Sequence, residues 1–181
     1  MTEFNDACLE AFPKWLASLN EDAVAMASLL VAESIPVPAR RHIAGAINYL
    51  FKSLDIIPDS IQDLGYLDDA FVLRVAALFA LDVPGTREAD GRGVLAGLAS
   101  DTAIIKQLLE GDYQRLERYV RTLAKGASRG RTVDEVLADP SVRSETIREL
   151  HAWSRQYEAP RLSGDDQMLI KLKSFLLTRL P

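Results

Sequence analysis

Apolar residues recur at helical spacing along almost the whole chain. Near the start, for example, Phe4, Cys8, Phe12 and Leu16 would share one face of a helix. We find no convincing stretch of alternating apolar and polar residues between hairpin turns, as a half-buried strand would require. Because each apolar face is too narrow to be stable alone, the pattern predicts an all-α protein whose helices pack as a bundle.

Prolines, glycines and capping residues divide this pattern into separate helices. In the first half, helices are expected over 5–19, 21–34, 38–55 and 66–81, with a short helical turn over 60–64. In the second half, they are expected over 94–99, 101–110, 112–124, 133–137, 142–157 and 165–180. Pro13 should kink or interrupt the first helix, and Asn20 should cap the second. The N-caps expected for later helices are Asp101, Asp112, Thr132, Ser141 and Ser163.

Residues 82–93 contain one proline, three glycines and several charged residues. Proline and glycine are the residue types that most often mark loops. This composition predicts an exposed loop or linker. It divides the chain into a helical region 1–85 and a helical C-terminal region 86–181. The sequence leaves open whether the two regions pack as one domain.

The composition is that of a packed globular protein. Of the 181 residues, 48% are hydrophobic and 26% charged, which argues against a disordered chain. No apolar run approaches the roughly 18 to 20 residues that a membrane span needs. The acidic start does not resemble a secretory signal, and Cys8 is the only cysteine. We therefore expect a cytoplasmic protein without a transmembrane span.

One segment carries a distinctive order of motifs. Tyr49-Leu50 is followed by Asp55-Ile56-Ile57-Pro58-Asp59 and then by Gly65-Tyr66-Leu67-Asp68-Asp69, with an apolar helix after them. In this order and spacing, residues 44–79 resemble the YkvA-like family, a bacterial helical domain of unknown function. The resemblance implies two antiparallel helices joined by a tight acidic turn, but it implies no reaction and no ligand. The motif residues that could form a binding site are Asp55, Pro58, Asp59, Gly65, Tyr66, Asp68 and Asp69.

The carboxylates of this turn have two interpretations. Asp55, Asp59, Asp68 and Asp69 could together bind a divalent cation such as Mg²⁺, Mn²⁺ or Ca²⁺, because hard cations prefer oxygen ligands. The structural interpretation, which we favour, places Asp59 as a cap and Asp68 and Asp69 in the first turn of the next helix. There the helix dipole stabilises negative charge. The spacing is not that of an EF-hand loop.

Basic residues concentrate in a different segment, from Lys106 to Arg131. Its second part, from Arg118 to Arg131, could bind an anionic surface, which would make the association dependent on salt. It lacks the ending of a phosphate-binding loop, and the chain as a whole has a net charge of −5, so nucleic-acid binding is not expected. We expect most of these side chains simply to be solvated.

These observations favour one function and leave a second open. The favoured function is a non-enzymatic module that binds a protein partner, or a membrane surface, through an apolar groove beside the acidic turn. The alternative is a metal-dependent hydrolase of phosphate esters that uses the four aspartates as metal ligands. The sequence does not decide whether the chain is an enzyme.

Overall fold

The computed structural model describes residues 3–52, 55–58, 60–61 and 64–181. The first half contains α1 (Glu3–Ser28), the 3-10 helix η1 (Leu29–Val31), α2 (Val37–Tyr49) and α3 (Leu67–Asp82). The second half contains α4 (Arg92–Ser100), α5 (Thr102–Leu109), η2 (Glu110–Asp112), α6 (Tyr113–Leu123), β1 (Ala127–Ser128), β2 (Arg131–Thr132), α7 (Val133–Ala138), α8 (Pro140–Gln156) and α9 (Asp166–Arg179). The predicted all-α bundle is confirmed, although the sequence did not predict the two-residue antiparallel pair β1–β2.

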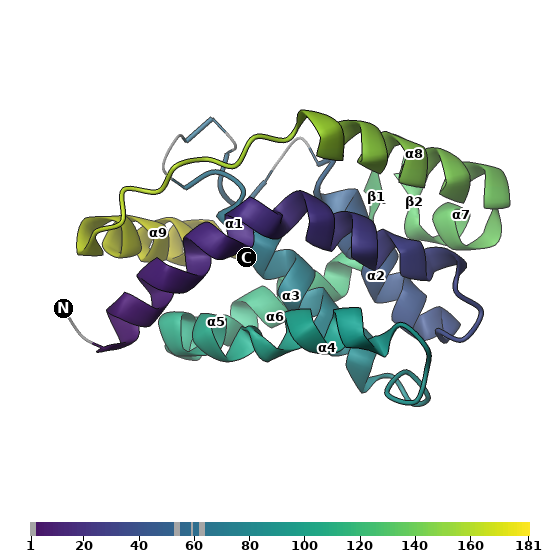
Figure 1. The fold of residues 1–181 in the computed structure, drawn as a ribbon, viewed down its shortest axis with the longest axis horizontal. Helices are drawn as coiled ribbons and strands as arrows, with labels where there is room; N and C mark the ends of the chain where they lie inside the picture. The colour runs from purple at the N-terminus through teal and green to yellow at the C-terminus, as the bar shows by residue number, and fades with distance from the viewer. Residues whose placement is uncertain (1–2, 53–54, 59, 62–63) are drawn as a thin grey trace.

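Helix α3 forms the centre of the bundle. Its sequence is apolar on nearly every side, and all of its residues except Leu78 and Asp82 are buried. Helices α2 and α4 pack along it, and α1 crosses the bundle beside them (Figure 1). Burial extends around the helix because a central helix has neighbours on several sides.

Helix α1 joins two elements that the sequence analysis separated. It runs through both Pro13 and Asn20 without ending. Asn20 does not cap a helix, since its amide nitrogen donates hydrogen bonds to the backbone oxygen and the hydroxyl of Ser154 in α8. The predicted break at Asn20 was wrong because this side chain connects two helices that are distant in sequence.

The caps of α7, α8 and α9 follow the expected chemistry with small shifts in position, whereas Asp101 and Asp112 precede α5 and α6 without a side-chain cap hydrogen bond. Thr132 caps α7 through a complete capping box, as predicted. Helix α8 is capped by Asp139 rather than Ser141, and α9 by Asp165 rather than Ser163. In both cases the aspartate side chain accepts hydrogen bonds from backbone N–H groups of the first turn.

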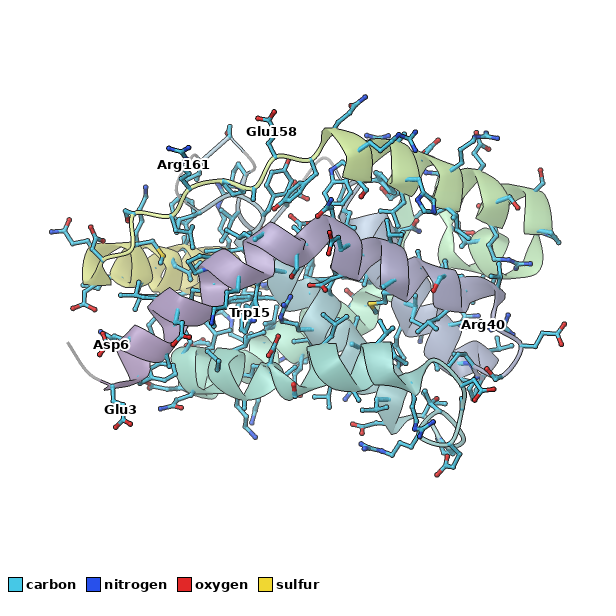
Figure 2. The ribbon with its side chains drawn as sticks, in the orientation of Figure 1. Glu3, Asp6, Trp15, Arg40, Glu158 and Arg161 are labelled. Carbon is cyan, nitrogen blue, oxygen red and sulfur yellow. The ribbon has the colours of Figure 1, made fainter. Side chains whose placement is uncertain are left out.

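The C-terminal region packs against the N-terminal one. A single hydrophobic cluster extends from Cys8 in α1 to Leu180 after α9. The connection between α8 and α9, marked by Glu158 and Arg161 in Figure 2, passes over α1, and the Tyr157 hydroxyl donates a hydrogen bond to the Leu16 carbonyl at 2.8 Å. Within the described part of the chain, no helix combines the length and the apolar character that crossing a membrane would take.

Candidate functional site

The acidic turn between α2 and α3 is held by a buried hydrogen-bond network. The Tyr49 hydroxyl donates to Asp68 Oδ2 at 2.6 Å and accepts from the Ile56 N–H at 2.9 Å. The same Asp68 oxygen accepts from the Ile57 N–H at 3.0 Å. Helix α2 therefore ends at Tyr49, not near Asp55 as predicted, because the chain turns back to bring these two N–H groups to the tyrosine and the aspartate.

Burial gives this network its strength. Asp68 is fully buried and Tyr49 is 1% exposed, so neither group can replace its partners with water. Burial raises the pKa of the Tyr49 hydroxyl far above its ordinary value, and the nearby carboxylates of Asp68 and Asp69 raise it further. The hydroxyl consequently stays protonated and available as a donor.

The other predicted residues of the turn are spread around this network. Asp68 and Asp69 stand in the first turn of α3, as the structural interpretation requires, and Asp69 is 3% exposed. Tyr66 precedes the helix in the left-handed conformation, with φ of 67°.

The rest of the turn is held by backbone hydrogen bonds. The Pro58 carbonyl accepts a hydrogen bond from the Ile61 N–H, and the Gly65 N–H donates to the Ile61 carbonyl. Asp55 is half-buried beside Ile56, and Asp59 lies outside the described residues.

The cation hypothesis stays a prediction. Across the described ranges, no group of three or more His, Cys, Asp or Glu side chains could hold a metal ion. Asp59 and Asp63 are outside those ranges. Asp68, one of the four expected ligands, already uses one carboxylate oxygen to accept two hydrogen bonds that shape the turn.

An aromatic cluster covers the end of the turn. The Tyr66 ring lies 5.3 Å from the ring of Tyr157 and 6.5 Å from that of Trp153, and the last two rings are 5.1 Å apart. All three side chains are half-buried. The apolar surface beside the acidic turn is therefore a cluster of rings in mutual contact, contributed by α8 as well as by the turn.

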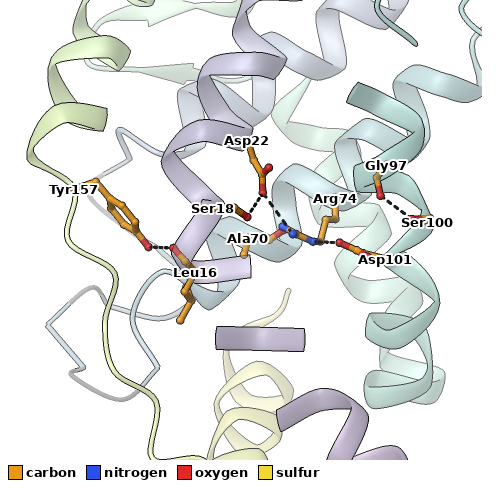
Figure 3. A network of polar contacts seen from close by, with 9 residues as sticks. All are labelled: Leu16, Ser18, Asp22, Ala70, Arg74, Gly97, Ser100, Asp101 and Tyr157. Carbon is orange, nitrogen blue, oxygen red and sulfur yellow. Dashed lines mark hydrogen bonds and ion pairs between the residues drawn. The ribbon is translucent and has the colours of Figure 1, made fainter. Parts of the chain in front are cut away.

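A second polar network lies on the other side of α1 (Figure 3). At its centre is Arg74 of α3, which is 2% exposed. Its Nε donates to Asp101 Oδ2 at 2.9 Å, its Nη2 lies 3.5 Å from Asp22 Oδ2, and its Nη1 donates to the Ala70 carbonyl at 3.2 Å. The guanidinium also stacks over the ring of Trp15, 4.2 Å from its centre.

This network forms the floor of an open groove between α1 and α4, which we call the α1–α4 groove. Its volume is about 400 Å³. Figure 2 shows Trp15 on the side of α1 that faces this groove. Small residues form much of the walls, including Ala25 on α1 and Gly93 and Gly97 on α4, and a Cβ atom added at either glycine would meet no other atom within 4 Å. The full lining is Lys14, Trp15, Ser18, Asp22, Ala25, Arg74, Gly93, Val94, Gly97, Leu98 and Asp101.

The floor of the α1–α4 groove has an excess of negative charge. One buried guanidinium faces two carboxylates, and the side chains of Asp22 and Asp101 remain 24% and 32% exposed. Burial raises the pKa of Asp22 above its ordinary value, and the neighbouring Asp101 also raises it, while hydrogen bonds from Ser18 and the charge of Arg74 lower it. The pKa is raised because burial disfavours the ionised form of Asp22 by more than Ser18 and Arg74 favour it.

None of these residues was expected to form a site, and Asp101 was expected only as an N-cap. The available signal was Arg74, which is the only charged residue within 70–81, a segment that is otherwise apolar. A single charge in an apolar helix must find a partner when it is buried. The partners could not be identified from the pattern, because Asp22 and Asp101 look like residues of a first helical turn. Asp101 does stand at the N-cap position before α5, but its side chain binds Arg74 instead of capping.

The basic segment uses some of its side chains within the protein. The Arg121 guanidinium lies over the Phe79 ring, 3.9 Å from its centre, and Arg131 forms an ion pair with Glu149 at 2.6 Å. Binding of this segment to an anionic surface stays a prediction.

Comparison with known families agrees with the motifs. Residues 39–74 match the family model described as "Protein of unknown function (DUF1232)". This is the YkvA-like domain, so the resemblance read from the sequence is confirmed for the segment that includes α2, the acidic turn and the first half of α3. No curated protein and no solved structure matches the chain.

Proposed function

We propose that this protein, which carries a YkvA-like domain of unknown function at residues 39–74, is a non-catalytic module that binds a basic helical segment of a partner protein. The binding site is the α1–α4 groove. The observation that supports it best is the buried Arg74 held between two partly exposed carboxylates at the floor of an open groove.

The shape of the groove suits a helix. Its walls are two helices, and the lining positions Lys14, Ser18, Asp22 and Ala25 follow one stripe of α1 over about three turns. Glycines on the opposite wall allow a partner backbone to come close. Amphipathic helices commonly bind in apolar grooves of this kind, with side chains at i, i+3, i+4 and i+7 as anchors.

The charge at the floor of the groove favours a basic partner, because Lys14, the other cation of the lining, forms an ion pair with Glu10. Asp22 and Asp101 together carry one more negative charge than Arg74 neutralises. An arginine or lysine from the partner would compensate this charge, while an acidic helix would be repelled.

The test is photocrosslinking from inside the groove. A benzophenone amino acid replaces Ala25 in the full chain, and the control carries it at Ala17, which is exposed on α1 outside the groove lining. Crosslinked segments are identified by mass spectrometry. We expect Ala25 to crosslink to basic helical segments and Ala17 not to. Equal crosslinking from both positions, or crosslinks from Ala25 to segments without basic residues, would refute the proposal.

A synthetic peptide of the crosslinked segment then gives the affinity. In a Trp153→Phe background, Trp15 is the remaining tryptophan, so its fluorescence reports occupation of the groove. Ala25→Leu should abolish the fluorescence change by filling the groove, while Ala17→Leu should preserve it. Exchanging the basic residues of the peptide for glutamate should prevent binding.

The alternative of a metal-dependent hydrolase predicts a different result. Mg²⁺, Mn²⁺ or Ca²⁺ added to chelator-stripped protein would then raise the melting temperature, because a ligand of the folded state stabilises it. Asp59→Asn and Asp69→Asn would each remove that effect. The crosslinking experiment does not depend on this outcome.

A further inference from the structure

A small cavity lies between α2 and the connection from α6 to β1. Its volume is about 130 Å³. It is lined on one side by residues of one stripe of α2 and the turn after it, and on the other by the end of α6 and the residues that follow. The lining residues are Gly45, Asn48, Tyr49, Lys52, Thr122, Leu123, Gly126 and Ala127.

The close approach of two backbones creates this cavity. A Cβ atom at Gly45 would come within 2.8 Å of the carbonyl carbon and oxygen of Leu123, so only glycine fits there. Helix α2 is therefore held directly against the end of α6. Asn48 lies one helical turn further along and faces the same connection.

The side-chain amide of Asn48 is buried and has no hydrogen-bond partner among the described residues. The residue is 5% exposed, and among the described residues neither its amide nitrogen nor its amide oxygen has a hydrogen-bond partner. Leaving a buried polar group without a partner costs about 1–3 kcal/mol. A primary amide presents a donor and an acceptor side by side, so a ligand that matches both would recover this cost.

The other polar groups of the cavity restrict the ligand further. Lys52 is the only charged side chain among the described lining residues. Its ammonium donates to the Tyr119 hydroxyl at 3.1 Å and has further protons to donate. The Thr122 hydroxyl donates to the Tyr119 carbonyl at 2.6 Å, which leaves its oxygen as an acceptor. The cavity thus offers an ammonium and an amide N–H to an anion, and an amide oxygen and a hydroxyl oxygen to a donor.

We propose that this cavity binds a small hydroxycarboxylate. The carboxylate accepts from the Lys52 ammonium and the Asn48 amide nitrogen, and the neighbouring hydroxyl donates to the Asn48 amide oxygen. The cavity has room for about four water molecules at the volume each occupies in the liquid. A molecule of the size of glycolate therefore fits, and a larger acid such as citrate does not.

The experiment titrates the full chain with glycolate and follows the melting temperature and the heat of binding. Acetate serves as the probe without the hydroxyl, and sodium chloride at the same ionic strength as the probe without either group. Glycolate should give a saturable shift and bind about fivefold more tightly than acetate, the effect of one neutral hydrogen bond. Sodium chloride should give no saturable shift.

Three variants assign the binding to this cavity. Lys52→Met and Asn48→Leu should each weaken glycolate binding about tenfold or more, because each removes a hydrogen bond to a charged group. Lys125→Met is the matched control, since Lys125 is exposed next to the cavity but does not line it, and it should bind normally. Circular dichroism confirms that each variant is folded, and Lys52→Met tests the site if Asn48→Leu does not fold.

Two results would overturn the proposal. The first is the absence of a saturable effect of glycolate, which would mean that the cavity holds only water. The second is equal binding by the wild type, Lys52→Met and a folded Asn48→Leu, which would place the glycolate elsewhere.

Discussion

Replacing Tyr49 with phenylalanine tests whether one hydroxyl holds the acidic turn. The substitution keeps the ring, which lies against that of Tyr119 at 6.0 Å between centres, and removes only the oxygen. Two interactions are lost together: the bond donated to Asp68 at 2.6 Å and the bond accepted from the Ile56 N–H at 2.9 Å. Both partners remain buried, since Asp68 is fully buried and Ile56 is 5% exposed.

The expected loss follows from these two interactions. A hydrogen bond to a charged group contributes about 1.5–3 kcal/mol, and a buried N–H left without a partner costs about 1–3 kcal/mol. Because the turn can adjust and admit water, we expect a loss of about 3 kcal/mol in the free energy of unfolding. For a chain of this length, that corresponds to a fall of about 6–12 °C in the melting temperature.

Urea unfolding at pH 7, followed by circular dichroism, measures this loss. Tyr119→Phe is the matched control, because its hydroxyl accepts only from the half-buried Lys52 at 3.1 Å among the hydrogen bonds we describe, and it should cost less than about 1 kcal/mol. A double-mutant cycle with Asp68→Asn should give a coupling energy of at least about 1 kcal/mol between the two positions. If Tyr49→Phe costs no more than Tyr119→Phe, the hydroxyl does not hold the turn and our reasoning is wrong.

The same substitution predicts a change at alkaline pH. The pKa of Tyr49 is raised in the folded state, whereas in the unfolded chain it returns to about 10.0. The unfolded state therefore loses this proton first, and the stability that Tyr49 contributes is present below pH 10 and declines above it. The free energy of unfolding should therefore fall less steeply above pH 10 in Tyr49→Phe than in the wild type. Equal slopes of this free energy against pH in the two proteins would contradict the raised pKa.

Four further predictions concern other parts of the molecule. Gly45→Ala should cost about 1–3 kcal/mol through its clash with α6, whereas Gly97→Ala, which meets no atom, should be neutral or stabilising by up to about 1 kcal/mol in the same urea assay. Arg74→Met should cost about 3 kcal/mol, because it leaves two carboxylates without their cation. Asp22→Asn should change the free energy of unfolding little at pH 7. The pKa of Asp22 is raised in the folded state, so its ionisation makes the folded protein less stable as the pH rises above 3.8, and asparagine avoids this effect. A large loss of stability in Asp22→Asn would refute this. Cys8 is fully buried and its pKa is raised to about 11, so a thiol reagent at pH 8 should label it only as fast as the protein opens; labelling at the rate of a free thiol would contradict its burial.

Much of the fold could be predicted from local patterns. Helical spacing and the absence of strand patterns indicated the helices, and Thr132 was correctly expected as the N-cap of α7. The errors arose where a distant contact overrides a local preference. Asn20 has the chemistry of a cap but bonds to Ser154 across 134 residues, and Asp101 has the chemistry of a cap but binds Arg74.

The candidate site was less predictable than the fold. The motif pointed to Asp68 as one of several residues of the turn, but its hydrogen bond with the Tyr49 hydroxyl joins residues 19 positions apart and depends on the fold. The α1–α4 groove depends on three helices that meet only in the folded protein. Periodicity gives the buried face of each helix, but it does not say which helix lies opposite or what space remains between them.

The two proposed sites share one relation to the YkvA-like segment. Arg74 lies at the last position of the match, whereas its partners Asp22 and Asp101 come from helices before and after it. In the same way, Asn48 and Lys52 lie within the match and Thr122 lies outside it. The matched segment therefore supplies a few polar groups of each proposed site, and the flanking helices supply the others. It follows that a chain with the same matched segment but different flanking helices would keep the Tyr49–Asp68 network and would bind different ligands.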